Sequence, residues 1–291
     1  MPARLAAVTA AALVAAVHGR VPVDGHAMYY RCEGSGHPTV VLEAGSPDTS
    51  TVWQWVEPAL ARVTRVCAYD RAGLGRSAPA PRTQHRTART QVRELHSLLR
   101  KARIPGPYVL VGHSWGGMLA ELFAHDYPDE TVGLVLLDPT TFPYLTPDAL
   151  RHLPRRLTRE GIDVSATVAE VSAIRTLGRL PLVVIGNGRG RADARLRAAQ
   201  DALARLSSDS VHAIALGSTH YVQKPPPAGH GGRRRGGPRG SGGGAATPTP
   251  ARMRSALLWR ARRVPSIAAA ATPAGDRSRP PARRRPRARS R

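Results

Sequence analysis

The stretch Tyr108–Leu119, which reads Y-V-L-V-G-H-S-W-G-G-M-L, constrains the fold more than any other part of the sequence. Its first four residues, 108–111, are apolar and predict a buried strand, and apolar residues at helical spacing over 117–125 predict a helix. The pattern Gly-x-Ser-x-Gly lies between them at 112–116. A strand that runs directly into a helix around a serine forms a sharp turn with a strained serine backbone. We therefore predict that Ser114 stands clear of a sheet as a nucleophile.

The glycines of this pattern meet a steric requirement of the turn. Side chains two residues before and two residues after the serine would collide, and Gly112 and Gly116 occupy these places. The helix that begins there directs backbone N–H groups at any anion that forms above Ser114. The alternative is a serine that caps a helix and has glycine neighbours by chance. The preceding strand, the following helix and the additional Gly117 favour the nucleophile.

Positive charge is concentrated at the C-terminal end of the chain. The formal charge of the 291 residues is +23, but residues 225–291 contain 17 arginines, no lysine and one acid. Such a Pro-, Gly- and Arg-rich composition cannot bury enough apolar surface to fold, so it predicts a disordered tail. A genuine tail would bind polyanions without specificity. A frameshift in GC-rich DNA would produce the same composition, and we favour that origin.

The N-terminal residues 1–20 contain an uncharged stretch over 5–17 that follows one arginine. The stretch is too short to span a bilayer, but it fits the apolar region of a secretory signal, with small residues for cleavage at 14–16. This interpretation places the protein outside the cell or in the cell envelope. The alternative is an alanine-rich N-terminus of a cytoplasmic protein.

Between these two ends, over residues 21–224, apolar runs alternate with stretches of helical spacing. Strands are expected at 21–23, 28–32, 38–42, 65–69, 108–111, 132–137, 182–185 and 211–216, and helices at 52–62, 87–102, 117–125 and 193–206. The alternation predicts an α/β fold with a mostly parallel central sheet and helices on both faces. Chemistry in such folds lies beyond the carboxyl ends of the strands.

The chain resembles the α/β-hydrolase superfamily over residues 21–224. Three motifs carry the resemblance: G-H-S-W-G-G at 112–117, D-R-A-G-L-G-R-S at 70–77 and G-S-T-H-Y at 217–221. The resemblance implies hydrolysis of an ester, or less often of an amide, a lactone or an epoxide. It also implies that residues 140–178, where no strand is expected, form a helical cap over the substrate pocket.

Serine as the nucleophile narrows the expected reaction. Epoxide and halide hydrolysis in this superfamily generally uses an aspartate, so Ser114 favours acyl chemistry through a covalent acyl-enzyme. We predict a serine hydrolase of small or medium carboxylic esters that needs neither cofactor nor metal and has no specific nucleic-acid partner. The alternative is a catalytically impaired hydrolase-fold protein whose basic tail binds polyanions.

The resemblance assigns the general base to the histidine that follows the last strand, which is His220. Imidazole titrates near neutral pH and can accept the proton of a serine hydroxyl. The alternative role of His220 is that of an ordinary loop histidine.

Two residues compete for the carboxylate that orients this histidine. Most members of the superfamily carry it three residues past the glycine that ends the strand before the last helix, but here that glycine is Gly186 and position 189 is arginine. Asp138, at the tip of the preceding strand, lies where some lipases of this fold carry their acid; its alternative role is to cap a turn. Asp193 is the reserve candidate, and its alternative role is to cap a helix. We choose Asp138.

The oxyanion hole is expected to consist of two backbone N–H groups. By analogy with the superfamily they belong to Trp115, directly after the nucleophile, and to Ser46, in the loop after the third strand. The small residues at 44–46 suit a close approach of that loop to the nucleophile.

Two further features have structural interpretations. Residues 70–77 predict a turn in which Gly73 and Gly75 provide the bends and Asp70 pairs locally with Arg71. The two cysteines, at 32 and 67, fall on strands that the superfamily places side by side. A disulfide between Cys32 and Cys67 and a pair of buried free thiols both remain open.

Overall fold

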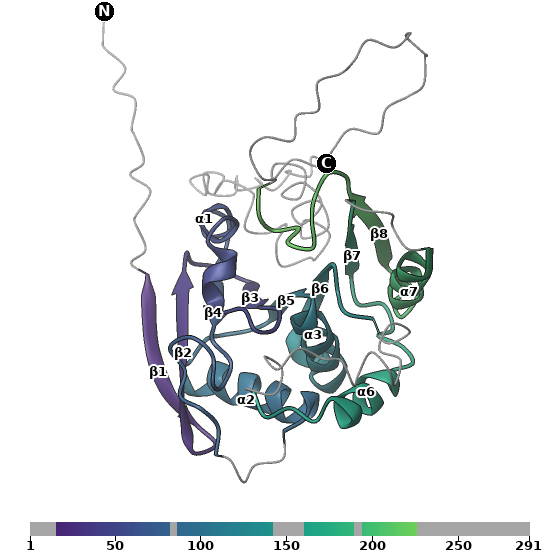
Figure 1. Ribbon diagram of the computed structural model, residues 1–291. Coiled ribbons are helices and arrows are strands. Elements are labelled where there is room, and N and C mark those ends of the chain that lie inside the picture. Colours follow the sequence, from purple (N-terminus) through teal and green to yellow (C-terminus); the bar gives the residue numbers. More distant parts are fainter. Residues whose placement is uncertain (1–15, 82–85, 142–159, 189–193, 226–291) are drawn as a thin grey trace, which may run out of the picture.

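The computed structural model describes residues 16–81, 86–141, 160–188 and 194–225. Among these residues, eight strands form one sheet in the order β1-β2-β4-β3-β5-β6-β7-β8 (Figure 1). The strands are β1 Val17–Val23, β2 His26–Glu33, β3 Thr39–Glu43, β4 Val66–Tyr69, β5 Tyr108–His113, β6 Thr131–Leu137, β7 Leu182–Asn187 and β8 Ser210–Ala215. β2 pairs antiparallel with β1 and β4, and the strands from β4 through β3 to β8 pair in parallel. The predicted mostly parallel sheet is confirmed.

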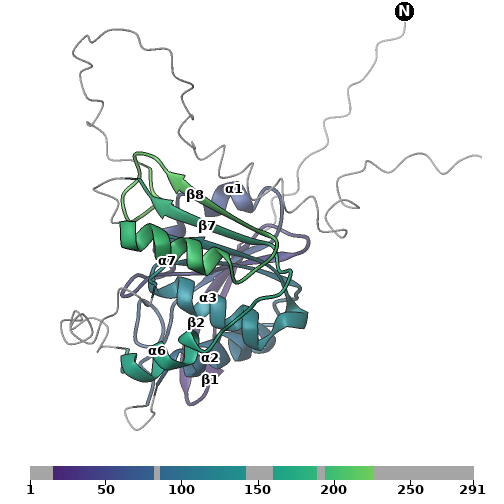
Figure 2. The same cartoon turned by 90° about the vertical axis from the view of Figure 1, so that its right-hand side faces the viewer.

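Helices cover both faces of this sheet. One face carries α2 Ala88–Lys101, α3 Trp115–Asp126, α6 Val164–Ser172 and α7 Ala194–Ala204, and the other carries η1 Ser50–Trp53 and α1 Glu57–Leu60. Figures 1 and 2 show α1 on the opposite side of the sheet from α2 and α3. A short 3-10 turn, η2 Pro128–Glu130, joins α3 to β6. A separate cluster of buried aliphatic side chains packs on each face, so the parallel strands are apolar on both sides, as expected for a sheet between two layers.

Two expected boundaries differ from the structure. β1 begins at Val17, four residues before the start of the first expected strand at residue 21. The single helix expected at 52–62 is instead the 3-10 turn η1 followed by the one-turn helix α1. Pro58 explains the interruption, because it fits the first turn of a helix but has no N–H for a helix that runs through it.

The predicted cap insertion at 140–178 lies partly outside the described residues, since its segment 142–159 is not among them, nor is the tail 226–291. Within the described part, α6 packs against the start of α2. Thr167 Oγ1 accepts a hydrogen bond from the N–H of Ala88, and Glu170 accepts bonds from Thr87 and from the N–H of Arg89. These contacts satisfy N–H groups at the start of α2 that have no partner within the helix. No helix among the described residues is both long enough and apolar enough to cross a membrane.

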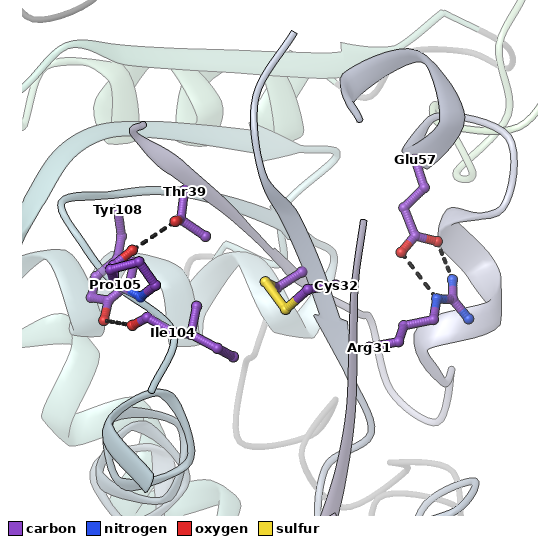
Figure 3. The surroundings of a disulfide bond; sticks show 8 residues. Arg31, Cys32, Thr39, Glu57, Ile104, Pro105 and Tyr108 are labelled. Carbon is purple, nitrogen blue, oxygen red and sulfur yellow. Dashed lines mark hydrogen bonds and ion pairs between the residues drawn. A yellow bond between two sulfur atoms is a disulfide. The ribbon is translucent and has the colours of Figure 1, made fainter. Parts of the chain in front are cut away.

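A disulfide joins Cys32 in β2 to Cys67 in β4 (Figure 3). The two residues lie directly opposite each other in the antiparallel pair, with their Cα atoms 4.1 Å apart, and both are buried. The bond closes a loop of 35 residues that includes β3, η1 and α1. It therefore restricts the unfolded chain around the centre of the sheet.

We expect the double variant Cys32→Ala, Cys67→Ala to be less stable than the parent protein. The chain-entropy estimate for a loop of this size is about 3–4 kcal/mol of unfolding free energy at 25 °C. Urea unfolding followed by circular dichroism, on the double variant and on the parent with and without reductant, measures the loss. Equal stability of all samples, with free thiols detected in the untreated parent, would contradict the disulfide.

Candidate active site

Ser114 occupies a sharp turn between β5 and α3. Its backbone has φ 52° and ψ −119°, a left-handed conformation that costs energy for a residue with a side chain. A Cβ atom at Gly112 would lie 2.4 Å from the carbonyl oxygen of Gly116, and one at Gly116 would lie 2.4 Å from the carbonyl oxygens of Glu43 and Ala44. The two glycines are therefore a steric necessity of this turn, as the sequence pattern predicts.

His220 and Asp138 meet at the same edge of the sheet. His220 follows β8, Asp138 follows β6, and the distance from His220 Nδ1 to Asp138 Oδ2 is 2.6 Å. The N–H of Ser114 donates to the carbonyl of Leu137, next to Asp138, which connects the serine turn to the end of β6. The structure thus brings together the predicted Ser114, His220 and Asp138. Asp193 lies outside the described residues.

The Asp138 carboxylate is buried and well supplied with donors. Besides His220, the side chain of Asn187 donates to it at 2.8 Å, and the N–H of Asn187 and the side chain of Gln200 donate at 3.2 Å each. Burial by itself would raise the pKa of Asp138, but the hydrogen bonds from His220 and Asn187 lower it below the usual value. Asp138 is therefore ionised at neutral pH and holds a proton on Nδ1 of His220, which leaves Nε2 free to accept one.

Ser114 and His220 lie at the same edge of the sheet but are not hydrogen-bonded to each other. Over the described parts of the chain, the hydroxyl of Ser114 bonds to no group of His220, and its neighbour is the Thr140 hydroxyl at 3.4 Å. The His220 side chain is 50% exposed, so its ring is open to solvent and to a bound substrate. Bonds of this kind often form only when substrate is in place.

His113 holds the loop of His220 against the end of β5. Its Nε2 lies 2.9 Å from the carbonyl oxygen of His220, and the two rings have centroids 4.7 Å apart. Burial lowers the pKa of His113 to about 4, and the nearby His220 adds to this effect. Neutral His113 donates its Nε2 proton to the His220 carbonyl, because that oxygen can only accept.

The loop after β3 lies against Ser114. A Cβ atom at Gly45 would lie 3.2 Å from Cβ of Ser114, so the loop passes the serine at van der Waals distance. Trp115 is the first residue of α3, where backbone N–H groups have no partner within the helix. Trp115 and the loop that contains Ser46, where the two oxyanion donors are predicted, therefore lie on two sides of Ser114.

A family model described as alpha/beta hydrolase fold matches residues 38–182. The chain belongs to the α/β-hydrolase superfamily. The uncharacterized protein YqjL of Bacillus subtilis (strain 168) is 29% identical over 218 residues, which span 70% of this chain and 85% of YqjL. The soluble epoxide hydrolase of Corynebacterium sp. (strain C12) is 39% identical over 122 residues, which span 42% of this chain and 41% of that enzyme.

Solved structures agree with the assignment to this superfamily. The structure of the epoxide hydrolase CorEH without ligand has a TM-score of 0.55 and 22% identity, and the match covers 72% of this chain and 93% of that one. At this identity the likeness shows the fold. Active sites of α/β folds lie at the carboxyl ends of parallel strands. The edge of the sheet that carries Ser114, Asp138 and His220 is therefore the candidate active site of this α/β hydrolase.

The prediction that Asp70 pairs with Arg71 in the turn 70–77 is wrong. Asp70 accepts hydrogen bonds from the N–H groups of Ser50 and Arg76, at 2.7 and 2.9 Å, and so fixes the turn. The Arg71 side chain instead reaches the loop after β3 and the carboxylate of Glu160. The two bends at glycine are confirmed, since Gly73 and Gly75 have φ values of 80° and 51°.

Sequence reasoning missed several polar residues of this site. Asn187, Gln200 and Glu160 have no signature spacing, and only the fold brings them to Asp138 or to the loop after β3. Only Asn187 could have been suspected from the sequence, because it directly follows Gly186 at the end of an expected strand. The His, Cys, Asp and Glu side chains in the described ranges form no group of three or more that could hold a metal ion.

A cavity of about 650 Å³ lies at the other end of α3 from the candidate site. It is lined mainly by apolar residues, among them Ala124, Pro128, Leu177 and Leu180, together with His125. None of the candidate site residues lines it, so we do not assign it to the reaction at Ser114.

The lowered pKa of His113 predicts a pH-dependent stability. Between pH 6.5 and about 4 the unfolded chain binds a proton at this residue and the folded protein does not, so the contribution is complete above pH 6.5 and is lost as the pH falls to 4. The shift corresponds to roughly 3 kcal/mol of unfolding free energy. Urea unfolding of the parent and of His113→Gln from pH 7 to pH 4 should show the steeper loss in the parent. Parallel pH profiles of the two proteins would contradict this account of His113.

Proposed function

We propose that this α/β hydrolase cleaves small or medium carboxylic esters as a serine hydrolase with an acyl-enzyme intermediate. The observation that carries the proposal is the strained turn at Ser114, beside a 2.6 Å contact between His220 Nδ1 and the Asp138 carboxylate. All three residues follow parallel strands, whose carboxyl ends lie at one edge of the sheet. A serine, a buried carboxylate and a histidine base, in this order along the chain, serve acyl transfer on this fold.

In the proposed reaction, Nε2 of His220 accepts the proton of the Ser114 hydroxyl while Oγ attacks the carbonyl carbon of the ester. The carbonyl oxygen becomes an oxyanion and accepts hydrogen bonds from the N–H groups of Trp115 and Ser46. The carbon–oxygen bond to the alcohol then breaks, and His220 gives its proton to the departing alkoxide. Asp138 stabilises the imidazolium throughout. Water, deprotonated by His220, attacks the acyl-serine, and the carboxylic acid leaves as Ser114 recovers its proton.

The residue type at position 114 distinguishes esters from epoxides. The soluble epoxide hydrolase of Corynebacterium is similar to this chain, but epoxide opening in the superfamily generally proceeds through an aspartate nucleophile. A serine in the turn cannot form the alkyl ester that water then hydrolyses at an aspartate carbonyl. An acyl donor supplies the carbonyl that Ser114 requires.

We also propose that the protein acts outside the cytoplasm. Disulfides such as Cys32–Cys67 persist mainly in oxidising compartments. The uncharged stretch 5–17 contains small residues at 14–16, and β1 begins at Val17. Cleavage after Ala16 would therefore leave every described strand whole.

We expect the parent protein to hydrolyse p-nitrophenyl esters, and Ser114→Ala and His220→Ala to lose that activity. Removing a residue of such a triad lowers kcat by roughly 10⁴–10⁶-fold. The rate of p-nitrophenolate release, measured for acetate to decanoate esters, also gives the preferred acyl length. A folded parent protein without activity would reject ester cleavage and favour the impaired hydrolase-fold protein with a polyanion-binding tail.

The identity of the carboxylate is tested with a conservative change. Asp138→Asn keeps the shape of the side chain but removes the charge that stabilises the imidazolium and can favour the wrong tautomer of His220, so kcat should fall by roughly 10³–10⁴-fold. Asp193→Asn is the matched control and should keep nearly full activity. The opposite result, with activity lost only in Asp193→Asn, would transfer the role to Asp193. Thermal unfolding of both variants checks that they are folded.

A further inference from the structure

Arg71 is buried beneath the loop after β3 and uses all five of its N–H donors. Nε and Nη2 donate to the two carboxylate oxygens of Glu160, at 2.8 and 3.2 Å, and Nη1 donates to Glu43 at 2.7 Å. The remaining donors bind the carbonyl oxygens of Ala44, from Nη1, and of Gly45, from Nη2 at 2.9 Å. An arginine with 2% exposure and five bonds has no conformational freedom.

These bonds contribute to the orientation of the peptide group between Gly45 and Ser46. In a trans peptide the C=O and the following N–H point in opposite directions. The carbonyl of Gly45 points toward Arg71, so the N–H of Ser46 points away from it. Gly45 itself packs against Cβ of Ser114. The guanidinium of Arg71, together with the N–H of Asp48, which donates to the same carbonyl at 3.0 Å, thus holds the proposed oxyanion donor of Ser46 in one orientation beside Ser114.

Glu160 connects this loop to the second proposed donor. One of its oxygens accepts the hydroxyl of Ser46 at 2.7 Å, and the other accepts the side-chain amide of Gln91 at 3.1 Å. The Gln91 carbonyl oxygen in turn accepts the indole N–H of Trp115 at 3.3 Å. Through these bonds one buried carboxylate contacts Ser46 directly and Trp115 through one intermediate side chain.

We propose that Arg71 and Glu160 are positioning residues that preorganise the oxyanion hole, Arg71 through the peptide plane of Ser46 and Glu160 through the Ser46 hydroxyl and Gln91. The inference rests on the proposed function, because it assumes that an oxyanion forms above Ser114. Neither residue touches the reacting atoms. Glu160 lies within the expected cap insertion 140–178, so its carboxylate also connects that insertion to the loop of Ser46.

The test uses Ser46→Ala, which keeps the backbone N–H but removes the bond to Glu160. Ser46→Thr keeps a hydroxyl and serves as the conservative rescue. Glu160→Gln keeps the size of the side chain but removes its charge and presents an amide to Arg71. Glu57→Gln is the matched control: Glu57 is a buried carboxylate that pairs with Arg31 beside α1, and it belongs to no part of the site (Figure 3).

We expect kcat for p-nitrophenyl acetate to fall roughly 10-fold in Ser46→Ala and up to about 100-fold in Glu160→Gln, since loss of a complete oxyanion donor costs about 10²–10³-fold. KM should change little, because the ground-state ester gains little from the hole. Affinity for a trifluoromethyl ketone, whose adduct with serine carries an oxyanion, should fall in parallel with kcat. Ser46→Thr should recover most of the rate, and Glu57→Gln should lose thermal stability without a change in kcat.

Several results would overturn the inference. If Ser46→Ala keeps the parental kcat and the parental affinity for the trifluoromethyl ketone, or if its losses are matched by Glu57→Gln, Arg71 and Glu160 support the fold alone. A rise in KM at unchanged kcat would instead assign Ser46 to substrate binding. If the parent protein itself hydrolyses no ester, the proposed function fails and the inference fails with it; an active parent with unaffected variants rejects the inference alone. Should Glu160→Gln not fold, Ser46→Ala and Ser46→Thr decide the question.

Discussion

The close approach of α3 to the loop after β3 is the constraint on which the candidate site depends. Gly116 has no side chain, and its place against the carbonyl oxygens of Glu43 and Ala44 leaves no room for one. Because α3 begins this close to the loop, Ser114 lies at van der Waals distance from Gly45. The same approach forces the left-handed backbone at Ser114, a strain that packing of β5 and α3 on the sheet compensates. A side chain at position 116 would push α3 away from this loop and so separate Ser114 from the proposed oxyanion donor of Ser46.

The parallel sheet brings the three residues of the candidate site to one edge. Ser114, Asp138 and His220 are separated by 24 and 82 residues along the chain, yet each follows a parallel strand, so one edge collects them. Asp138 itself has φ 39°, and the N–H of Asp138 donates to the carbonyl of Ile185 in β7. Asp138 is thus fixed between β6 and β7. Its carboxylate accepts hydrogen bonds from Asn187 and Gln200 in addition to the contact with His220. With Asp138 after β6 as the proposed acid, no carboxylate is needed from the segment after β7 that includes position 189.

The parts of this arrangement that could be predicted are those with a periodic or a steric signal. Alternating apolar runs located every strand of the described residues, and the glycines around Ser114 predicted the strained turn because their requirement is local. Pro58 was visible in the sequence, but the helical spacing of its neighbours concealed the break between η1 and α1. The five bonds of Arg71 could not be predicted, because their partners at 43–45 and 160 converge only in the folded protein. The sequence suggested a pair with the adjacent Asp70, but in the fold backbone N–H groups occupy that carboxylate.

Covalent labelling tests the central claim most directly. An organophosphonate with a p-nitrophenyl leaving group reacts with a serine only when the serine is activated and an oxyanion hole is present. Incubation with the full-length parent protein, followed by proteolysis and mass spectrometry of the peptide that contains Ser114, locates the adduct. The account predicts stoichiometric modification of Ser114 that slows strongly in His220→Ala. A folded parent protein without an adduct, or an adduct at another residue that persists in Ser114→Ala, would contradict it.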